Sequence, residues 1–147
     1  MAAITPKVFL EFLHLAGIII GLGAVTVVDT MGFISRNSKK WTQVTIDAHH
    51  VTKPLIWLGI ALIVPTWLLR LYIYPIGSIA SWKTGLLAAM ILNGCFLSFY
   101  VSPYLDGLKG KDELVSKRLK RKITVSAIIS FLSWWSFVFL TVVSKAF

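Results

Sequence analysis

The chemically most versatile side chains of this 147-residue chain are its three histidines, His14, His49 and His50. A neutral imidazole can ligate haem iron or copper, and it can also relay protons. His14 lies in an apolar stretch three residues after Glu11, and this spacing places both side chains on one face of a helix. The other two histidines begin a second apolar stretch, close to Asp47. The sequence therefore predicts two separate candidate sites.

The elements that must hold these residues are membrane-spanning helices. Hydrophobic residues make up 56% of the chain and charged residues 14%, whereas a soluble domain holds about 25% charged residues. The mean hydropathy is +0.78. Four apolar runs, at residues 8–28, 55–74, 86–105 and 123–143, have about the 20 residues that an α-helix needs to cross the bilayer. We therefore expect an all-α integral membrane four-helix bundle.

The expected bundle forms a single transmembrane domain over residues 1–147. Its helices are predicted at about residues 8–33, 54–74, 83–105 and 122–144. Residues 41–53 are amphipathic, because apolar residues recur there at helical spacing among charged ones. They form either an extension of the second helix or a short helix on the headgroups that bends at Pro54.

Lysine and arginine are concentrated in two loops, residues 35–46 and 106–122. Short loops rich in these residues stay in the cytoplasm, so both loops are predicted to be cytoplasmic and both termini to be outside. The expected location is the cell inner (plasma) membrane. Most of the net charge of +9 then lies on one face, where anionic headgroups attract each basic residue by about 1 kcal/mol. We expect the lipid bilayer, and no nucleic acid, as the partner of this face.

The outer candidate site is built on His14. Glu11 shares its helix face, and Arg70 of the second run is within reach across the contact between the two helices. Two interpretations stay open: a haem or metal site in which Arg70 bonds a ligand carboxylate, or a polar cluster with an ion pair between Glu11 and Arg70. Trp134 and Trp135 lie midway along the fourth run, where an indole N–H finds no water, so we expect at least one of them to bond within the bundle or to a ligand. Trp134 is the one assigned to the outer site. Lys83 falls at the very edge of the third run.

The inner candidate site combines Asp29, at the end of the first run, with His49 or His50, and Asp47 lies three residues before His50. Carboxylate and imidazole suit a divalent metal or a proton relay. The alternative is a set of solvated residues at the headgroup boundary. His14 and Asp29 are fifteen residues apart, which is roughly 22 Å along a helix. One protomer therefore cannot place His14 and a member of the histidine pair on the same iron.

Small residues predict close packing between helices. Gly17 and Gly21 have GxxxG spacing, and Ser126, Ser130 and Ser133 follow one stripe of the fourth run. Such faces let helix backbones approach one another closely in membranes. Because they offer more packing surface than one small bundle uses, we expect a homo-oligomer or a subunit of a larger membrane complex.

The first 70 or so residues carry a family resemblance. The segments "FLEFLHLAG" at residues 9–17, "GLG" at residues 21–23 and "DTMGF" at residues 29–33 resemble small bacterial membrane families that include the copper-resistance CopD-type proteins and the membrane protoporphyrinogen oxidases. The resemblance implies a compact four-helix bundle. For the oxidases it also implies a b-type haem held by the histidine of the first helix, which corresponds to His14.

The leading hypothesis is a haem- or metal-binding redox protein of the membrane, with haem b as the expected cofactor. The sequence leaves open whether it is an enzyme such as a membrane oxidoreductase. One alternative is a small ion, proton or metal transporter in which Asp29, His49 and Glu11 line a path. Another is a structural accessory subunit. No nucleotide-binding loop or nucleophile elbow is present in the sequence.

Overall fold

The computed structural model describes residues 5–34, 38–73, 77–111 and 115–146. These residues are almost entirely helical. The elements in chain order are α1 (Pro6–Ile34), α2 (Lys39–Ile73), α3 (Ser78–Phe96), η2 (Leu97–Val101), α4 (Ser102–Asp106) and α5 (Lys117–Ala146). η2 is a π-helical turn, in which hydrogen bonds reach five residues along the chain instead of four.

The described residues contain four helices that are long and apolar enough to cross a membrane, because α3, η2 and α4 join into one span. Large apolar side chains on the outside of the bundle are solvent-accessible, for example Ile19 and Leu92 at 71% each. Exposure of this apolar surface to water would be unfavourable in free energy, whereas the hydrocarbon of a bilayer can cover it. The expectation of four helices with the length and apolar character to span a membrane is confirmed. The spans are Pro6–Ile34, Thr42–Ile73, Ser78–Asp106 and Lys117–Ser144.

The helices extend beyond the apolar runs that reveal them. α3 begins at Ser78 rather than near residue 83, and α5 begins at Lys117 rather than near residue 122. α2 continues through Pro54 and Pro65, whose rings lie on exposed parts of the helix. Residues 41–53 are thus an extension of the second helix and not a separate helix bent at Pro54.

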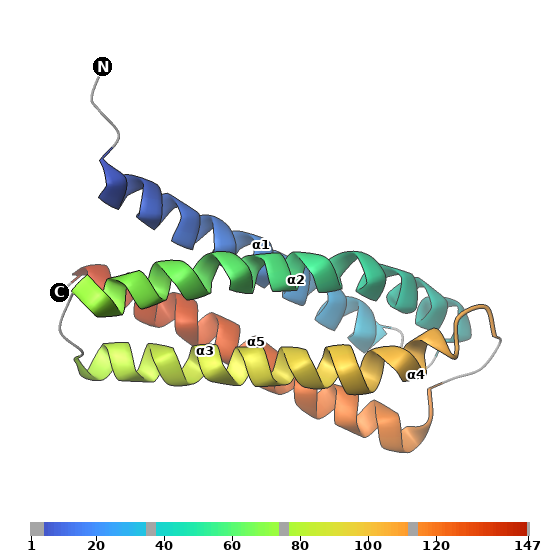
Figure 1. Cartoon of the computed structure of the whole chain (residues 1–147). Coiled ribbons are helices and arrows are strands. Elements are labelled where there is room, and N and C mark those ends of the chain that lie inside the picture. The colour runs from blue at the N-terminus through green and yellow to red at the C-terminus, as the bar shows by residue number, and fades with distance from the viewer. Residues whose placement is uncertain (1–4, 35–37, 74–76, 112–114, 147) are drawn as a thin grey trace.

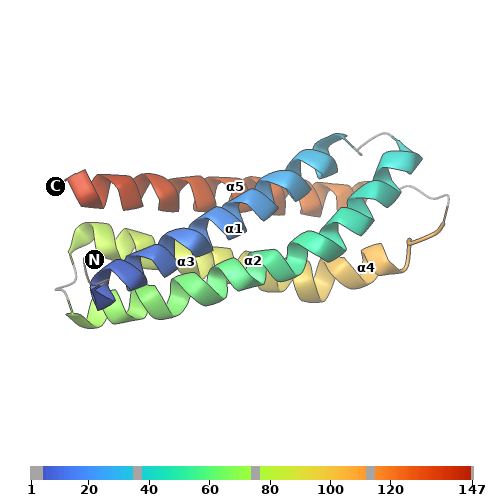
Figure 2. The same cartoon turned by 90° about the horizontal axis from the view of Figure 1, so that it is seen from above.

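The four spans pack as two close pairs, α1 with α2 and α3 with α5. Figures 1 and 2 show that α1 crosses α2 at an inclination, and that α1 begins at the same end of the bundle where α5 ends. Glycine makes the crossing possible: a Cβ on Gly59 would lie 2.7 Å from the carbonyl oxygen of Gly17 and 2.8 Å from Cα of Gly21. On another side, Gly21 meets the indole of Trp134. The prediction that Gly17 and Gly21 form a close-packing face is confirmed.

The serine stripe of α5 also lies inside the bundle, since Ser126, Ser130 and Ser133 are all buried. Ser126 donates its hydroxyl hydrogen to Oδ1 of Asn93 over 2.6 Å, and Nδ2 of Asn93 donates to the carbonyl oxygen of Ser126 over 3.1 Å. The glycine and serine faces are therefore both used within one chain. The expectation of an oligomer, which rested on spare packing surface, stays a prediction without that support.

Apolar side chains from all four spans form the core beside these contacts. The buried members are Ile18, Val25, Ile60, Ile63, Trp67, Leu87, Met90, Trp134 and Phe137. A second, smaller apolar cluster lies at the end of the bundle where α2 begins and α4 ends. Its buried members are Ile46, Val101 and Leu105.

Candidate functional site

His14 lies in α1 with its imidazole buried against α2. Its Nδ1 is 2.9 Å from Oγ1 of Thr66. The same hydroxyl lies 2.8 Å from the carbonyl oxygen of Leu62 and 2.9 Å from that of Ile63, both in its own helix. A hydroxyl has one hydrogen, and a threonine within a helix commonly donates it one turn back. With that donation made, His14 donates from Nδ1 to Thr66, and the lone pair of the neutral ring is on Nε2.

A cavity of about 400 Å³ adjoins His14 at the end of the bundle where α1 begins and α2 ends. His14 and Thr66 line it together with three charged residues, Glu11, Arg70 and Lys7. This volume falls within the range of sites that bind small molecules and cofactors. The structure thus brings together three of the four residues assigned to the outer site from the sequence. Its apolar lining comes mainly from Leu10, Leu15, Leu69 and Ile73.

Trp134, the fourth residue assigned to that site, does not line the cavity. Its side chain is 2% exposed and packs in the core against Gly21. The cavity reaches α5 at Thr141, seven residues further along, which is roughly 10 Å of helix. Trp134 therefore stabilises the helix crossing beneath the cavity.

Lys83 lies inside the bundle and not at its edge, with only 1% of its surface exposed. Its Nζ is 4.5 Å from the ring centroid of Trp67 and 4.9 Å from that of Phe137. The imidazole of His14 contacts the same two rings, with centroid distances of 6.4 Å to Trp67 and 5.9 Å to Phe137. Faces of aromatic rings attract a desolvated ammonium group. The structure therefore adds a buried lysine beside His14 that the sequence interpretation did not include.

A sequence signal for the position of Lys83 existed in its helical spacing. Lys83, Leu87 and Met90 are separated by four and three residues, and all three are buried on α3. This is the spacing of one helix face. Because the third apolar run begins at residue 86, hydropathy alone predicts Lys83 as a boundary residue. With α3 beginning at Ser78, it lies more than one turn inside the helix.

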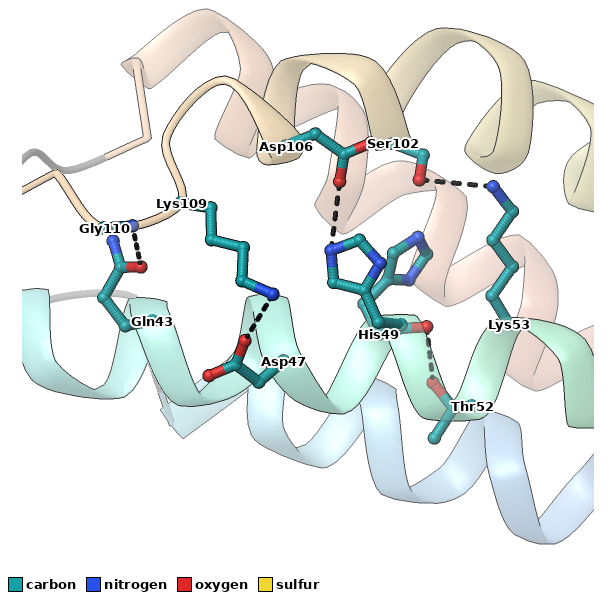
Figure 3. Close-up of polar contacts among 10 residues, drawn as sticks. Gln43, Asp47, His49, Thr52, Lys53, Ser102, Asp106, Lys109 and Gly110 are labelled. Carbon is teal, nitrogen blue, oxygen red and sulfur yellow. Dashed lines mark hydrogen bonds and ion pairs between the residues drawn. The ribbon is translucent and has the colours of Figure 1, made fainter.

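Asp47, His49 and His50 lie near the beginning of α2, at the opposite end of the bundle from His14. Figure 3 shows Asp47 and His49 there, with Lys109 beside Asp47. Asp47 pairs with Lys109 at 3.3 Å, and Nε2 of His50 is 3.1 Å from Oδ1 of Asp106. Both contacts join the first turns of α2 to α4 and the segment that follows it. Two of the four residues assigned to an inner metal site are therefore engaged in tying elements together.

His49 and Asp29 complete the inner set, and the structure does not join them. In the described part of the chain, Nε2 of His49 and Oδ2 of Asp29 are buried atoms without a hydrogen-bond partner. The described residues also contain no group of three or more His, Cys, Asp or Glu side chains that could hold a metal ion. A divalent metal at this end stays a prediction.

Gln43, which the sequence interpretation passed over, holds the segment after α4. Its Nε2 donates to the carbonyl oxygens of Leu108, over 3.0 Å, and Lys111, over 2.9 Å. Its Oε1 accepts from the backbone N–H of Gly110 over 3.0 Å (Figure 3). Nearby, Lys53 donates to the hydroxyl of Ser102 over 3.3 Å. Together these contacts hold α4 and the segment after it against α2. We call the three hydrogen bonds of Gln43 to this segment the clasp.

The two candidate sites lie far apart along the bundle. Thr66, the partner of His14, lies seventeen residues after His49 on α2, which is about 25 Å along the helix. Comparison of the chain with known protein families, with curated proteins and with solved structures gave no match. The resemblance of residues 9–33 to the CopD-type and oxidase families stays a prediction, and the function has to be argued from the outer cavity itself.

Proposed function

We propose that this chain is an integral membrane redox protein that binds haem b, or less specifically a metal, in the outer cavity with His14 as the ligand. The observation that carries the proposal is the cavity of about 400 Å³ in which His14 meets Glu11, Lys7 and Arg70 beside apolar walls. A haem needs as little as one ligand from the chain, whereas a bare catalytic metal usually takes three. The lining offers His14 and Glu11, which favours haem.

The residues around the cavity fit such a group. With its lone pair on Nε2, His14 can ligate iron, and Thr66 holds the other ring nitrogen in place, as partners of metal-bound histidines commonly do. Arg70 and Lys7 supply cations for the two propionate carboxylates. Glu11, one helical turn from His14, lines the same cavity beside them. When bound, the haem would supply one-electron transfer, the chemistry of a membrane oxidoreductase or electron carrier.

Visible absorption of the detergent-purified protein, expressed with haem available, tests this proposal. We expect a Soret band that shifts on reduction with dithionite, and we expect His14→Ala to abolish it. His49→Ala is the matched control, because His49 is equally buried but lies at the other end of the bundle. An undiminished Soret band in the His14→Ala variant, or no Soret band in the unmodified protein, would contradict the haem assignment.

No specific observation supports either of the two alternative functions, the transporter or the accessory subunit. Of the residues proposed for a transport path, Glu11 lines the outer cavity, whereas His49 lies near the beginning of α2, at the other end of the bundle. The accessory-subunit alternative needs a partner, and the small-residue faces proposed for one are buried within the chain. Assembly into a homo-oligomer or a larger complex therefore remains a prediction for size measurements in mild detergent.

We also propose a location and an orientation. The protein lies in the cell inner (plasma) membrane, with the basic loops at residues 35–46 and 106–122 in the cytoplasm and both termini outside. The support is the distribution of lysine and arginine. In this orientation the His14 cavity opens toward the outer face, and the basic end meets anionic headgroups.

A further inference from the structure

A second hollow lies between α3 and α5, away from the His14 cavity. It is an open groove of about 350 Å³ near the basic end of the bundle. Two cations, Arg121 and Lys122, line one part of it, and Phe96, Val125 and Ile129 line the apolar part. Val125 and Ile129 are 50% and 43% exposed, so the groove opens on the surface that faces lipid.

The two cations lie where the basic beginning of α5 changes to its apolar part. Arg121 and Lys122 are the last basic residues of α5 before the apolar run that begins at Ile123. Nζ of Lys122 donates to the hydroxyl of Tyr100 over 2.7 Å and lies 4.4 Å from the centre of that ring. One of three ammonium hydrogens is thus used to hold the side chain in place, and two remain for another acceptor.

The polar side chains deep in the groove already have hydrogen-bond partners. Asn93 and Ser126 line it, and they bond to each other through both polar groups of the asparagine side chain. They therefore do not call for a polar ligand deep in the groove. What the groove offers is a pair of cations at one end and an apolar wall beyond them.

We infer that this groove binds one anionic phospholipid, with its phosphate on Arg121 and Lys122 and an acyl chain along Phe96, Val125 and Ile129. From residue 121 to residue 129 the helix rises about 12 Å, so the wall can accept the first part of an acyl chain. Basic pockets between transmembrane helices are known sites for anionic headgroups. A free phosphate ion would use the cations and leave the apolar wall uncovered, which is why the proposed occupant is a lipid.

This site differs from the general attraction of a basic surface for anionic lipid. Lys117 and Arg118 lie on the same helix one turn earlier and are as exposed as Arg121 and Lys122, but they do not line the groove. Diffuse attraction would depend equally on both pairs, whereas a groove that binds one lipid depends on the second pair. The inference is independent of haem, because no residue of the His14 cavity takes part.

The test is native mass spectrometry of the full chain in detergent, titrated with phosphatidylglycerol or with phosphatidylcholine. We expect one tightly bound phosphatidylglycerol and weaker phosphatidylcholine binding. Loss of one basic contact should weaken binding about fivefold, and the double variant Arg121→Gln/Lys122→Gln about 25-fold. The control Lys117→Gln/Arg118→Gln removes the same charge and should change the affinity little. Helical circular dichroism shows whether each variant is folded.

A third variant tests the apolar wall without changing charge. Val125→Trp fills the groove and should also abolish the single tight binding event. Equal weakening in the two charge variants, unchanged binding in Val125→Trp, or equal affinity for both lipids would each overturn the inference. Competition by inorganic phosphate as effective as that by phosphatidylglycerol would overturn it as well, because it would assign the cations to a free anion.

Discussion

At the scale of single residues, the hydrogen bond between His14 and Thr66 decides what the outer cavity can do. It fixes the plane of a buried imidazole and selects which nitrogen carries the lone pair. Thr66 itself is held by its own helix through Leu62 and Ile63. Because this contact holds Nδ1, it orients the imidazole of His14 so that Nε2 can bind a metal or haem iron.

Thr66→Val keeps the shape of the side chain and removes the acceptor for Nδ1 of His14. A buried donor without its partner should destabilise the fold by about 1–3 kcal/mol. If haem is bound as proposed, its affinity should also fall by about 10–100-fold. Unfolding in detergent measures the first effect and haem titration the second.

Thr124→Val is the control for this change, because Thr124 is exposed on α5. Equal stability of the two variants would contradict the buried hydrogen bond. A Thr66→Val protein that is destabilised but binds haem normally would separate the structural role from the proposed ligand-orienting role.

Single residues also show the limit of the sequence interpretation. The grouping of His14, Glu11 and Arg70 followed from helical spacing and membrane depth, and these residues do line one cavity. Thr66, Trp67 and Phe137 could not be identified in the same way, since their contacts with His14 depend on how α1, α2 and α5 cross. Linear hydropathy shows where a helix lies in the chain but not which of its faces meets which neighbour.

At the scale of elements, the contact between α1 and α2 depends on glycine backbone. In Gly59→Ala the new methyl group would meet backbone atoms of Gly17 and Gly21 at 2.7–2.9 Å, so the two helices have to move apart. Such overpacking costs about 1–3 kcal/mol. Gly23→Ala is the control, because a Cβ there has no neighbour within 4 Å. Thermal unfolding in detergent should separate the two variants, and equal midpoints would contradict the packing.

The elements themselves were largely predictable, and their lengths were not. Four apolar runs and the spacing of Gly17 and Gly21 were sufficient for the four spans and one packing face. Beyond the apolar runs, hydropathy has no further information, so the first turn of α5 was found only in the structure. For α2, the amphipathic pattern of residues 41–53 predicted a helical extension as one of two alternatives, and the structure selects it. The clasp made by Gln43 belongs to this part, since it depends on carbonyl positions in the segment after α4.

At the scale of the whole molecule, the two ends differ in chemistry. One end holds a cavity with a buried histidine and a buried lysine next to it, and the other holds ion pairs, a backbone clasp and most of the positive charge. This asymmetry makes the two ends of the bundle chemically distinct. The proposed orientation places the cavity outside and the clasp in the cytoplasm.

Single-cysteine labelling measures that orientation, because the chain has one native cysteine, half-buried Cys95, which Cys95→Ala removes. In that background, Gly77→Cys lies between α2 and α3, and Ser116→Cys lies before α5. A maleimide that cannot cross membranes should label the first variant in intact spheroplasts and the second only after permeabilisation. The reverse pattern would contradict the proposed orientation.

The π-helical turn η2 has a consequence for the gene. A π-turn holds one residue more than an α-turn, so loss of one residue there restores an ordinary helix and leaves both flanking segments facing their neighbours. One turn earlier in α3, the same loss rotates everything beyond it by about 100°, and Ser102 and Asp106 turn away from Lys53 and His50. In-frame loss of a codon should therefore be tolerated at residues 97–101, and related genes that differ in length should differ there.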